Sequence, residues 1–305
     1  MAIDITDGVR SIGAAAVREL LPARPRLLAL GEPTHGEEAL LHLRNDLFRQ
    51  LVEEEGYRTI ALETDCMAGL VVDEHVGSDG TGSASGTGTG TGSGTGTASG
   101  TAPGAGTLDE VMERGFSHGW GAFAANRELV RWMRAHNEGR PASDRVRFAG
   151  FDGPLEITHA ASPRQALTAL HGYLAARVDA DLLPCTAETL DRLLGTDDRW
   201  TEPAAMTDPT RSAGRSAEAR ELRLLADDLV ALLDAHAPYL ITRTSREDLD
   251  RARLYGRTAT GLLRYHHAMA DPSLARMTRL CMLRDLMMAR NLLALAARGP
   301  VLVHA

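Results

Sequence analysis

The sequence predicts an α/β fold: a mostly parallel sheet core that starts with a βαβ unit and carries a large helical insertion. Two short apolar runs, at 26–32 and 57–64, flank a helical pattern, which is typical of a βαβ unit with parallel strands. Further apolar runs at 145–152 and 300–305 extend the sheet. Between them, from about 163 to 298, the apolar periodicity is almost wholly helical.

The first βαβ unit can be followed residue by residue. The run at 26–32 is short and apolar and ends in a turn signal, as a buried parallel strand does. Thr34 and Glu37 form a Ser/Thr-x-x-Glu capping box, so we expect a helix to begin there, with His35 in its first turn. Gly56 ends that helix, and the second strand follows directly.

The later elements fit a sheet interrupted by helices. Residues 108–114 and 129–138 are expected to be helical before the third strand. Further helices are expected over 165–178, 187–194, 218–236, 247–269 and 275–298. We therefore predict an α/β catalytic core made of 1–76, 107–160 and 299–305, and a mainly helical region at 161–298.

A Gly/Thr-rich tract at 77–106 interrupts the core. It holds twelve of the 30 glycines, and almost all its other residues are Thr, Ser or Ala. Such a chain cannot bury enough apolar surface to offset its ordering entropy, so we expect a disordered loop. Its GxG patterns neither follow a strand nor open a helix, which makes phosphate binding there a weak interpretation.

Charge and composition restrict the partners. The balance is 33 − 41 = −8, every basic residue is arginine, and no basic cluster stands out. This argues against nucleic acid or an anionic membrane as the main partner. We expect neither a membrane span nor a secretory signal. Cys66, Cys185 and Cys281 form no CxxC pair, which suggests neither disulfides nor zinc and fits a reducing cytoplasm.

Three acidic residues stand at the ends of the early strands: Glu32, Glu63 and Asp152. Because the carboxyl ends of parallel strands meet at one edge of a sheet, where ligands bind, these carboxylates are expected to converge. Each one alone could instead be a helix cap or a turn former. Three together, beside a histidine, favour a site.

His35 follows Glu32 by three residues and is the candidate general base. A carboxylate beside an imidazole orients the ring and stabilises its cation, a combination that proton transfer needs. The alternative is a histidine that merely occupies the first turn of the helix. Glu-x-x-His is also a metal-ligand spacing on helices, but Pro33 and the strand-to-helix turn break that geometry, so we predict no metal.

Arg44 falls within an apolar stripe of the first helix. That stripe contains Leu40, Leu47, Phe48 and Leu51. A charge on a buried helix face is costly unless it is paired or hydrogen-bonded, so we expect a strand-end carboxylate as its partner. The alternative is an arginine that reaches solvent at the edge of the stripe.

The last helix repeats this pattern with Arg284 and Asn291. The expected apolar face contains Met277, Cys281, Met288 and Leu295. Two polar side chains two turns apart on such a face suggest a polar pocket. The alternative to a polar pocket is an internal Arg–Asp network that uses Asp285.

Two further patterns are weaker. The G-x-S-x-G match around Ser117 would need a strand before the serine, but a helix is expected there, so Ser117 is a poor nucleophile candidate. His266 and His267 are adjacent on a helix and point about 100° apart, so joint metal ligation is disfavoured and a structural role is expected.

Together these motifs resemble the erythromycin esterase family. The run LGEPTHG at 30–36, Arg44 and IALE at 60–63 carry the first part of the resemblance. Its later part rests on ELVRWMRAHN at 128–137, VRFAGFD at 146–152 and RDLMMARN at 284–291, in the same order. The resemblance covers essentially the whole chain apart from the Gly/Thr tract.

The resemblance implies an α/β core with helical additions that hydrolyses a carboxylic ester, in known members a macrolide lactone, and so a link to antibiotic response. His35 would be the general base that activates water, with Glu32 and Glu63 orienting it and the nucleophile. Neither a cofactor nor a covalent serine is implied. The partner would be a small-molecule ester, and no protein partner is identifiable.

The remaining site residues also come from the resemblance. Arg44 and Arg284 would fill the arginine positions of the catalytic pocket, and Asp152 and Asn291 would bind substrate. The family's last motif is a strand that leads into His-Asn-x-His. Here the strand at 301–305 corresponds to that strand, and His304 stands just before the position at which the motif's histidines would follow. We therefore expect a C-terminally truncated family member. The alternatives are an inactive fragment, or a non-catalytic metal- or haem-binding protein that uses the same acid and histidine pocket.

Overall fold

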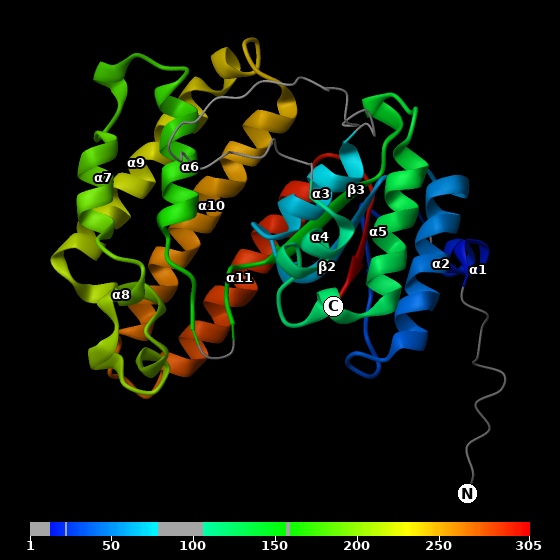
Figure 1. Ribbon diagram of the computed structural model, residues 1–305, viewed down its shortest axis with the longest axis horizontal. Coiled ribbons are helices and arrows are strands. Elements are labelled where there is room, and N and C mark those ends of the chain that lie inside the picture. Colours follow the sequence, from blue (N-terminus) through cyan, green and yellow to red (C-terminus); the bar gives the residue numbers. More distant parts are fainter. Residues whose placement is uncertain (1–12, 22, 79–105, 157–158) are drawn as a thin grey trace, which may run out of the picture. The chain divides into compact units, whose positions relative to one another are not determined.

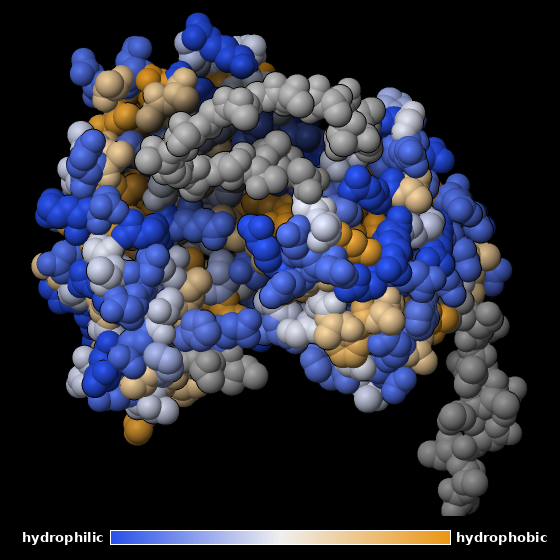
Figure 2. Space-filling model, viewed as in Figure 1, coloured by the Kyte–Doolittle hydropathy of each residue, from blue (hydrophilic) through white to orange (hydrophobic). Residues whose placement is uncertain are grey.

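The computed structural model describes residues 13–21, 23–78, 106–156 and 159–305. Residues 79–105, nearly all of the predicted Gly/Thr-rich loop, lie outside the described residues, so that prediction is not tested. The chain divides into two compact units, Met1–Gly150 with Ala294–Ala305, and Phe151–Leu293. Hydrophilic side chains cover most of the visible surface of each unit (Figure 2). The domain boundaries expected from the sequence stay a prediction.

The first unit is built on a four-stranded sheet with the order β1-β4-β2-β3. Its strands are β1 (Leu27–Leu30), β2 (Thr59–Asp65), β3 (Arg147–Asp152), whose last two residues belong to the second unit, and β4 (Val301–His304). Its helices are α1 (Ala14–Leu20), α2 (Glu38–Glu54), α3 (Gly69–Gly77), α4 (Leu108–Arg114) and α5 (Ala124–Asn137), with short 3₁₀ turns at Trp120–Ala122 and Ala142–Asp144 (Figure 1).

Strand β4 lies between β1 and β2 and pairs in parallel with both. Its residue His304 is in register with Leu30 of β1 and Leu62 of β2. Two residues earlier in each strand, and therefore on the same face, Leu28 and Ile60 are in register with Leu302. Because registered residues of parallel strands point to the same side, this face carries His304 at its carboxyl end.

The core of the first unit lies on that face. Ile60, Leu62 and Leu302 cluster there with buried side chains of α2, α3, α4 and α5. Leu41, Leu47, Phe48 and Leu51 supply the buried stripe of α2. The stripe predicted for this helix is thus largely confirmed, and Arg44 lies within it at 1% exposure.

The start of α2 differs from the expectation. The helix begins at Glu38 with Glu37 as its N-cap, and the Glu37 side chain accepts from the amide of Ala39 at 3.3 Å. The predicted capping box at Thr34 is wrong because Gly36 adopts a φ of +72°, in the left-handed region, which breaks the helix there. His35 therefore lies in a turn that precedes the helix.

The second unit is helical. It contains α6 (Arg164–Ala175), α7 (Ala187–Leu194), α8 (Asp198–Thr201), α9 (Ala217–Leu240), α10 (Arg246–Met269) and most of α11 (Arg276–Ala296), with 3₁₀ turns at Ala180–Leu182, Pro203–Met206, Pro209–Arg211 and Ala213–Arg215. Helix α10 packs against α6 and α9 (Figure 1). Leu262, Tyr265 and Met269 of α10 form a buried cluster with Leu280 and Met287 of α11.

This architecture confirms the predicted α/β class with a large helical insertion. The buried face of α11 is a correction, because it carries Leu280, Met287 and Asn291, whereas Met277 and Cys281 of the expected apolar face are exposed. Within the described part of the chain, no helix is long and apolar enough to cross a membrane.

Candidate active site

A carboxylate–histidine couple lies just beyond the carboxyl end of β1. Oε2 of Glu32 is 2.8 Å from Nδ1 of His35, and Oε1 of Glu32 accepts from the amide of Gly36 at 2.9 Å. The Glu32 amide in turn donates to the carbonyl of Ala305, just after β4, at 3.0 Å. The tight turn through Gly36 thus brings the histidine back onto the carboxylate, as the sequence spacing predicts.

The two members of this couple differ sharply in exposure. The side chain of Glu32 is 4% exposed, whereas that of His35 is 77% exposed. The His35 ring meets the Trp120 ring edge-on, with centroids 5.0 Å apart, and its Nε2 has no hydrogen-bond partner among the described residues. A buried carboxylate therefore orients a ring whose second nitrogen faces outward, which is the arrangement that general-base catalysis requires.

Arg44 lies behind the couple in a network of neutral amides. Its Nε and Nη2 donate to Oδ1 of Asn45 at 3.2 and 2.8 Å, and Nη2 also donates to Oδ1 of Asn126 at 2.7 Å. The amide groups of the two asparagines donate to the carbonyls of Ala125 and Trp120. The prediction that a strand-end carboxylate binds the Arg44 side chain is therefore wrong, because its hydrogen-bond partners are asparagines.

The charge of Arg44 consequently stays unneutralised by any direct ion pair within the described residues. Burial lowers its pKa to about 10, and attraction to Glu32 and Glu38 partly opposes that shift. The guanidinium is therefore still a cation near neutral pH. Its Nη1 makes no hydrogen bond to any described residue.

His304 joins the cluster from β4. It is 4% exposed, and burial, followed by the positive charge of Arg44, lowers its pKa to about 4, although Glu32 opposes the shift. At neutral pH its ring is uncharged. His304 is therefore a buried neutral neighbour of the couple.

Glu63 lies one residue beyond Leu62 in β2. Side chains alternate along a strand, so Glu63 leaves the sheet on the face opposite to Leu62 and His304. It is not among the hydrogen-bond partners of Glu32, His35 or Arg44. Among the first unit's candidates, the structure thus brings together Glu32 and His35, with Arg44 nearby, and places Glu63 on the other side of the sheet edge.

Asp152 and Arg284 form a separate pair in the second unit. Nε of Arg284 donates to both carboxylate oxygens of Asp152, at 3.2 and 3.1 Å, and Nη2 donates to Oδ2 at 2.8 Å. Asp152 is fully buried, while the Arg284 side chain is 37% exposed. The internal Arg–Asp network that was the alternative for this helix is present, but its acid is Asp152 and not Asp285.

Asn291 connects α11 to the carboxyl end of β3. Its Nδ2 donates to the carbonyl of Phe151 at 3.1 Å, and its Oδ1 accepts from Nε of Arg257 at 3.2 Å. With only 5% of the residue exposed, these bonds use the side chain for internal structure. Substrate binding by Asp152 and Asn291 stays a prediction.

The weaker patterns are structural. Ser117 follows α4 and not a strand, and its hydroxyl bonds Thr64 at 3.0 Å and accepts from the amide of Asp65 at 2.8 Å. His266 is buried, bonds the carbonyl of Ala161 at 2.9 Å and has a pKa lowered to about 4 by burial. Among the described residues, no group of three or more His, Cys, Asp or Glu side chains could hold a metal ion.

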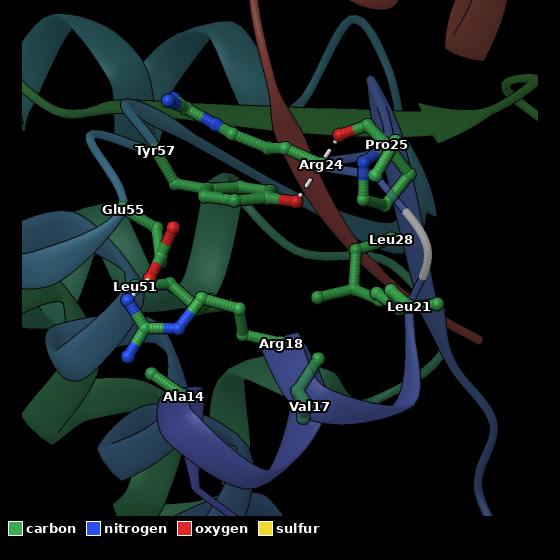
Figure 3. A pocket seen from close by; sticks show the side chains of 11 residues that line it. Ala14, Val17, Arg18, Leu21, Arg24, Pro25, Leu28, Leu51, Glu55 and Tyr57 are labelled. Carbon is green, nitrogen blue, oxygen red and sulfur yellow. Dashed lines mark hydrogen bonds and ion pairs between the residues drawn. The ribbon is translucent and has the colours of Figure 1, made fainter.

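A concave pocket lies at the opposite end of the strands from the couple. It is mainly apolar and is formed by α1, the chain before β1 and the end of α2, as Figure 3 shows. The Tyr57 hydroxyl donates to the carbonyl of Pro25 at 3.1 Å, and Arg18 pairs with Glu55 at 3.0 Å. Since ligands of parallel α/β sheets bind at the carboxyl ends of strands, this pocket is not the candidate active site.

The fold and the couple together define an α/β protein with an acid–histidine pair at the carboxyl edge of its sheet. The family model described as erythromycin esterase matches residues 52–305, and the chain belongs to this family. No curated protein matches the chain.

Several solved structures share the fold. A Bacillus cereus protein has a TM-score of 0.64 at 18% identity, over 96% of this chain and 60% of its own. A mutant of the erythromycin esterase EreC in its open conformation has a TM-score of 0.57 at 17% identity, over 92% and 60%. A succinoglycan biosynthesis protein has a TM-score of 0.59 at 15% identity, over 92% and 56%. The chain thus spans about three fifths of the length of the structures it matches.

Sequence reasoning missed the neutral partners of the site. Asn45 follows Arg44 directly, and Asn126 lies at the start of α5, 82 residues away from the arginine it binds. The edge contact of Trp120 with His35 also joins positions far apart in the sequence. The one available signal was Asn45, a second polar residue among the buried positions of α2.

Proposed function

We propose that this protein is a carboxylic ester hydrolase of the erythromycin esterase type, in which His35 activates water for attack on the ester. The observation that supports this most is the Glu32–His35 couple: a 4% exposed carboxylate bonded to Nδ1 of an exposed imidazole. With a proton on Nδ1 donated to Glu32, the lone pair of Nε2 is available to accept a proton from water.

The proposed reaction proceeds in two steps. Nε2 of His35 takes a proton from water as the hydroxide oxygen bonds to the ester carbonyl carbon, giving a tetrahedral oxyanion and an imidazolium. The oxyanion then collapses, the bond from carbon to the alcohol oxygen breaks, and the imidazolium returns its proton to the departing alkoxide. The products are a carboxylic acid and an alcohol.

The positive charge of Arg44 suits this chemistry. Its amide partners are neutral, so its field is not cancelled by direct pairing and acts on the negative charge that develops in the transition state. Glu63 is proposed to orient the nucleophile, and Asp152, Arg284 and Asn291 to contribute to the substrate site.

The proposed substrates are macrolide-type lactones, and the proposed biological role is a response to such antibiotics. Family membership and the fold shared with the EreC mutant support this class of substrate. A small-molecule substrate fits an exposed histidine at a sheet edge. We propose a cytoplasmic location and no requirement for a cofactor.

Replacing Glu32 tests the role of the couple. In Glu32→Gln the amide keeps the size of the side chain but not its charge, so kcat for ester hydrolysis should fall about a hundredfold with little change in KM. Glu37→Gln, an exposed carboxylate five residues later, is the matched control and should keep wild-type rates. Equal rates for Glu32→Gln and Glu37→Gln would refute the proposal.

A further inference from the structure

A cavity of about 350 Å³ lies between α9 and α10 in the second unit. Arg220, Arg223 and Asp227 of α9 line it at spacings of three and four residues, which place them on one helix face. Thr260 and Arg264 of α10 line the other wall, again four residues apart. The cavity therefore faces three guanidinium groups and a single carboxylate.

These arginines have no direct ion-pair partner among the described residues. Within the described part of the chain, the guanidinium groups of Arg220, Arg223 and Arg264 make no ion pair within 4.0 Å and no hydrogen bond. Several other arginines of this unit are paired, as Arg164 is with Asp191 and Asp197. In a chain with a net charge of −8, three cations without a direct ion pair are thus gathered around one cavity.

The arginines also repel one another. Burial lowers the pKa of Arg264, and the positive charges of Arg290 and Arg223 lower it further, with only Asp227 opposing. The neighbouring His267 responds in the same way: burial and then Arg223 and Arg215 lower its pKa, and its buried Nδ1 has no hydrogen-bond partner among the described residues. Folding therefore concentrates positive charge here at a cost.

We propose that this cavity is a binding site for a small soluble phosphate-bearing molecule, held by Arg220, Arg223 and Arg264. Guanidinium groups present paired N–H donors that match phosphate oxygens, and an anion would remove the mutual repulsion of the three cations. Exposed Leu224 on the rim and buried Leu263 on the wall provide apolar surface for the body of the ligand.

A diphosphate fits this arrangement better than a polymer does. The arginines converge on one cavity and do not extend along a surface, whereas nucleic-acid binding usually needs an elongated basic face. The cavity volume is also at the lower end for small-molecule sites. The site is independent of the proposed esterase chemistry and uses none of its residues.

Isothermal titration of the full 305-residue chain with pyrophosphate tests the proposal. We expect saturable binding with one site per chain, and a higher thermal midpoint in its presence. Arg223→Gln and Arg264→Gln should each weaken binding about tenfold or more, because each removes a charge-assisted contact. Both variants should fold at least as well as wild type without ligand, since each relieves repulsion.

Arg246→Gln is the matched control, because Arg246 is an exposed arginine at the start of α10 that does not line the cavity. It should bind pyrophosphate like wild type. Binding to vesicles that contain phosphatidylglycerol, or to duplex DNA, in the absence of pyrophosphate binding would overturn the proposal. So would no pyrophosphate binding at all, or equal weakening by all three substitutions, which would indicate diffuse electrostatics.

Discussion

Arg44 of α2 and Arg284 of α11 are both bound to buried polar side chains, and their partners differ. Arg44 in the first unit donates to the side-chain oxygens of Asn45 and Asn126. Arg284 in the second unit donates three hydrogen bonds to the fully buried carboxylate of Asp152. Both arrangements give a guanidinium hydrogen-bond acceptors, but only the second neutralises its charge.

The charge of Arg44 therefore remains available to act on nearby groups, whereas the charge of Arg284 is neutralised by an ion pair that stabilises the fold. Amide oxygens hold Arg44 in place and leave its field to act on Glu32 and on any anion that forms nearby. A carboxylate partner turns Arg284 into the half-exposed member of an ion pair, whose loss would leave a buried acid without that partner. Substitution of Arg44 should therefore mainly lower activity, and substitution of Arg284 should mainly lower stability.

Of the two arginine substitutions, Arg44→Met is expected to have the larger effect on activity. Removal of the cation should lower kcat/KM for ester hydrolysis about a thousandfold, because a preorganised charge near the transition state is lost. Stability should fall much less, since the groups left behind are neutral amides. Steady-state kinetics alongside urea unfolding separates the two quantities, and a variant that unfolds readily but retains its rate when folded would break the comparison.

Arg284→Met should mainly lower the stability of the protein. We expect a loss of about 3 kcal/mol in the free energy of unfolding, because Asp152 stays buried without its bidentate partner. Combining it with Asp152→Asn should restore part of that stability, as urea unfolding would reveal. If the single and double variants are equally unstable, the pair is not what holds this region together.

Acid should destabilise both units through buried histidines. His304 and His266 have folded pKa values of about 4, below the ordinary 6.5, so the unfolded chain takes up protons first as the pH falls. Their contribution is fully present above about pH 6.5 and is lost as the pH falls toward 4, by roughly 2 kcal/mol per histidine at pH 5.

Urea unfolding between about pH 8 and pH 5 measures this loss. His266→Gln should remove the part that belongs to the second unit. Arg44→Met should reduce the part that belongs to His304, because the positive charge of Arg44 is one cause of its low pKa. A stability that does not change over this pH range would contradict the burial of both rings as neutral groups.

The sequence predicted the elements of this fold better than their contacts. Apolar runs located the four strands, and helical periodicity located α4, α7, α10 and α11 to within about two residues. The Glu32–His35 contact followed from a local spacing of three residues. The burial of Arg44 followed from helical periodicity alone.

What the sequence could not predict depends on distant partners or on single backbone angles. Arg284 meets Asp152 across 132 residues, and no local pattern distinguishes this acid from the neighbouring Asp285. The beginning of α2 moved because of the left-handed conformation of Gly36, which the capping-box pattern does not reveal. The exposed face of α11 was misjudged because Met277 and Cys281 are apolar residues that remain at the surface.

The most direct test of the proposed site compares two histidines of the first unit. His35→Ala should lower kcat/KM for small esters and macrolide lactones by about 10³-fold, because general-base catalysis is removed. His42→Ala is the matched control, since His42 is half-exposed on α2 and pairs with Glu128. We expect this fall for the first substitution only, with wild-type turnover in His42→Ala. Unchanged turnover in His35→Ala would contradict it.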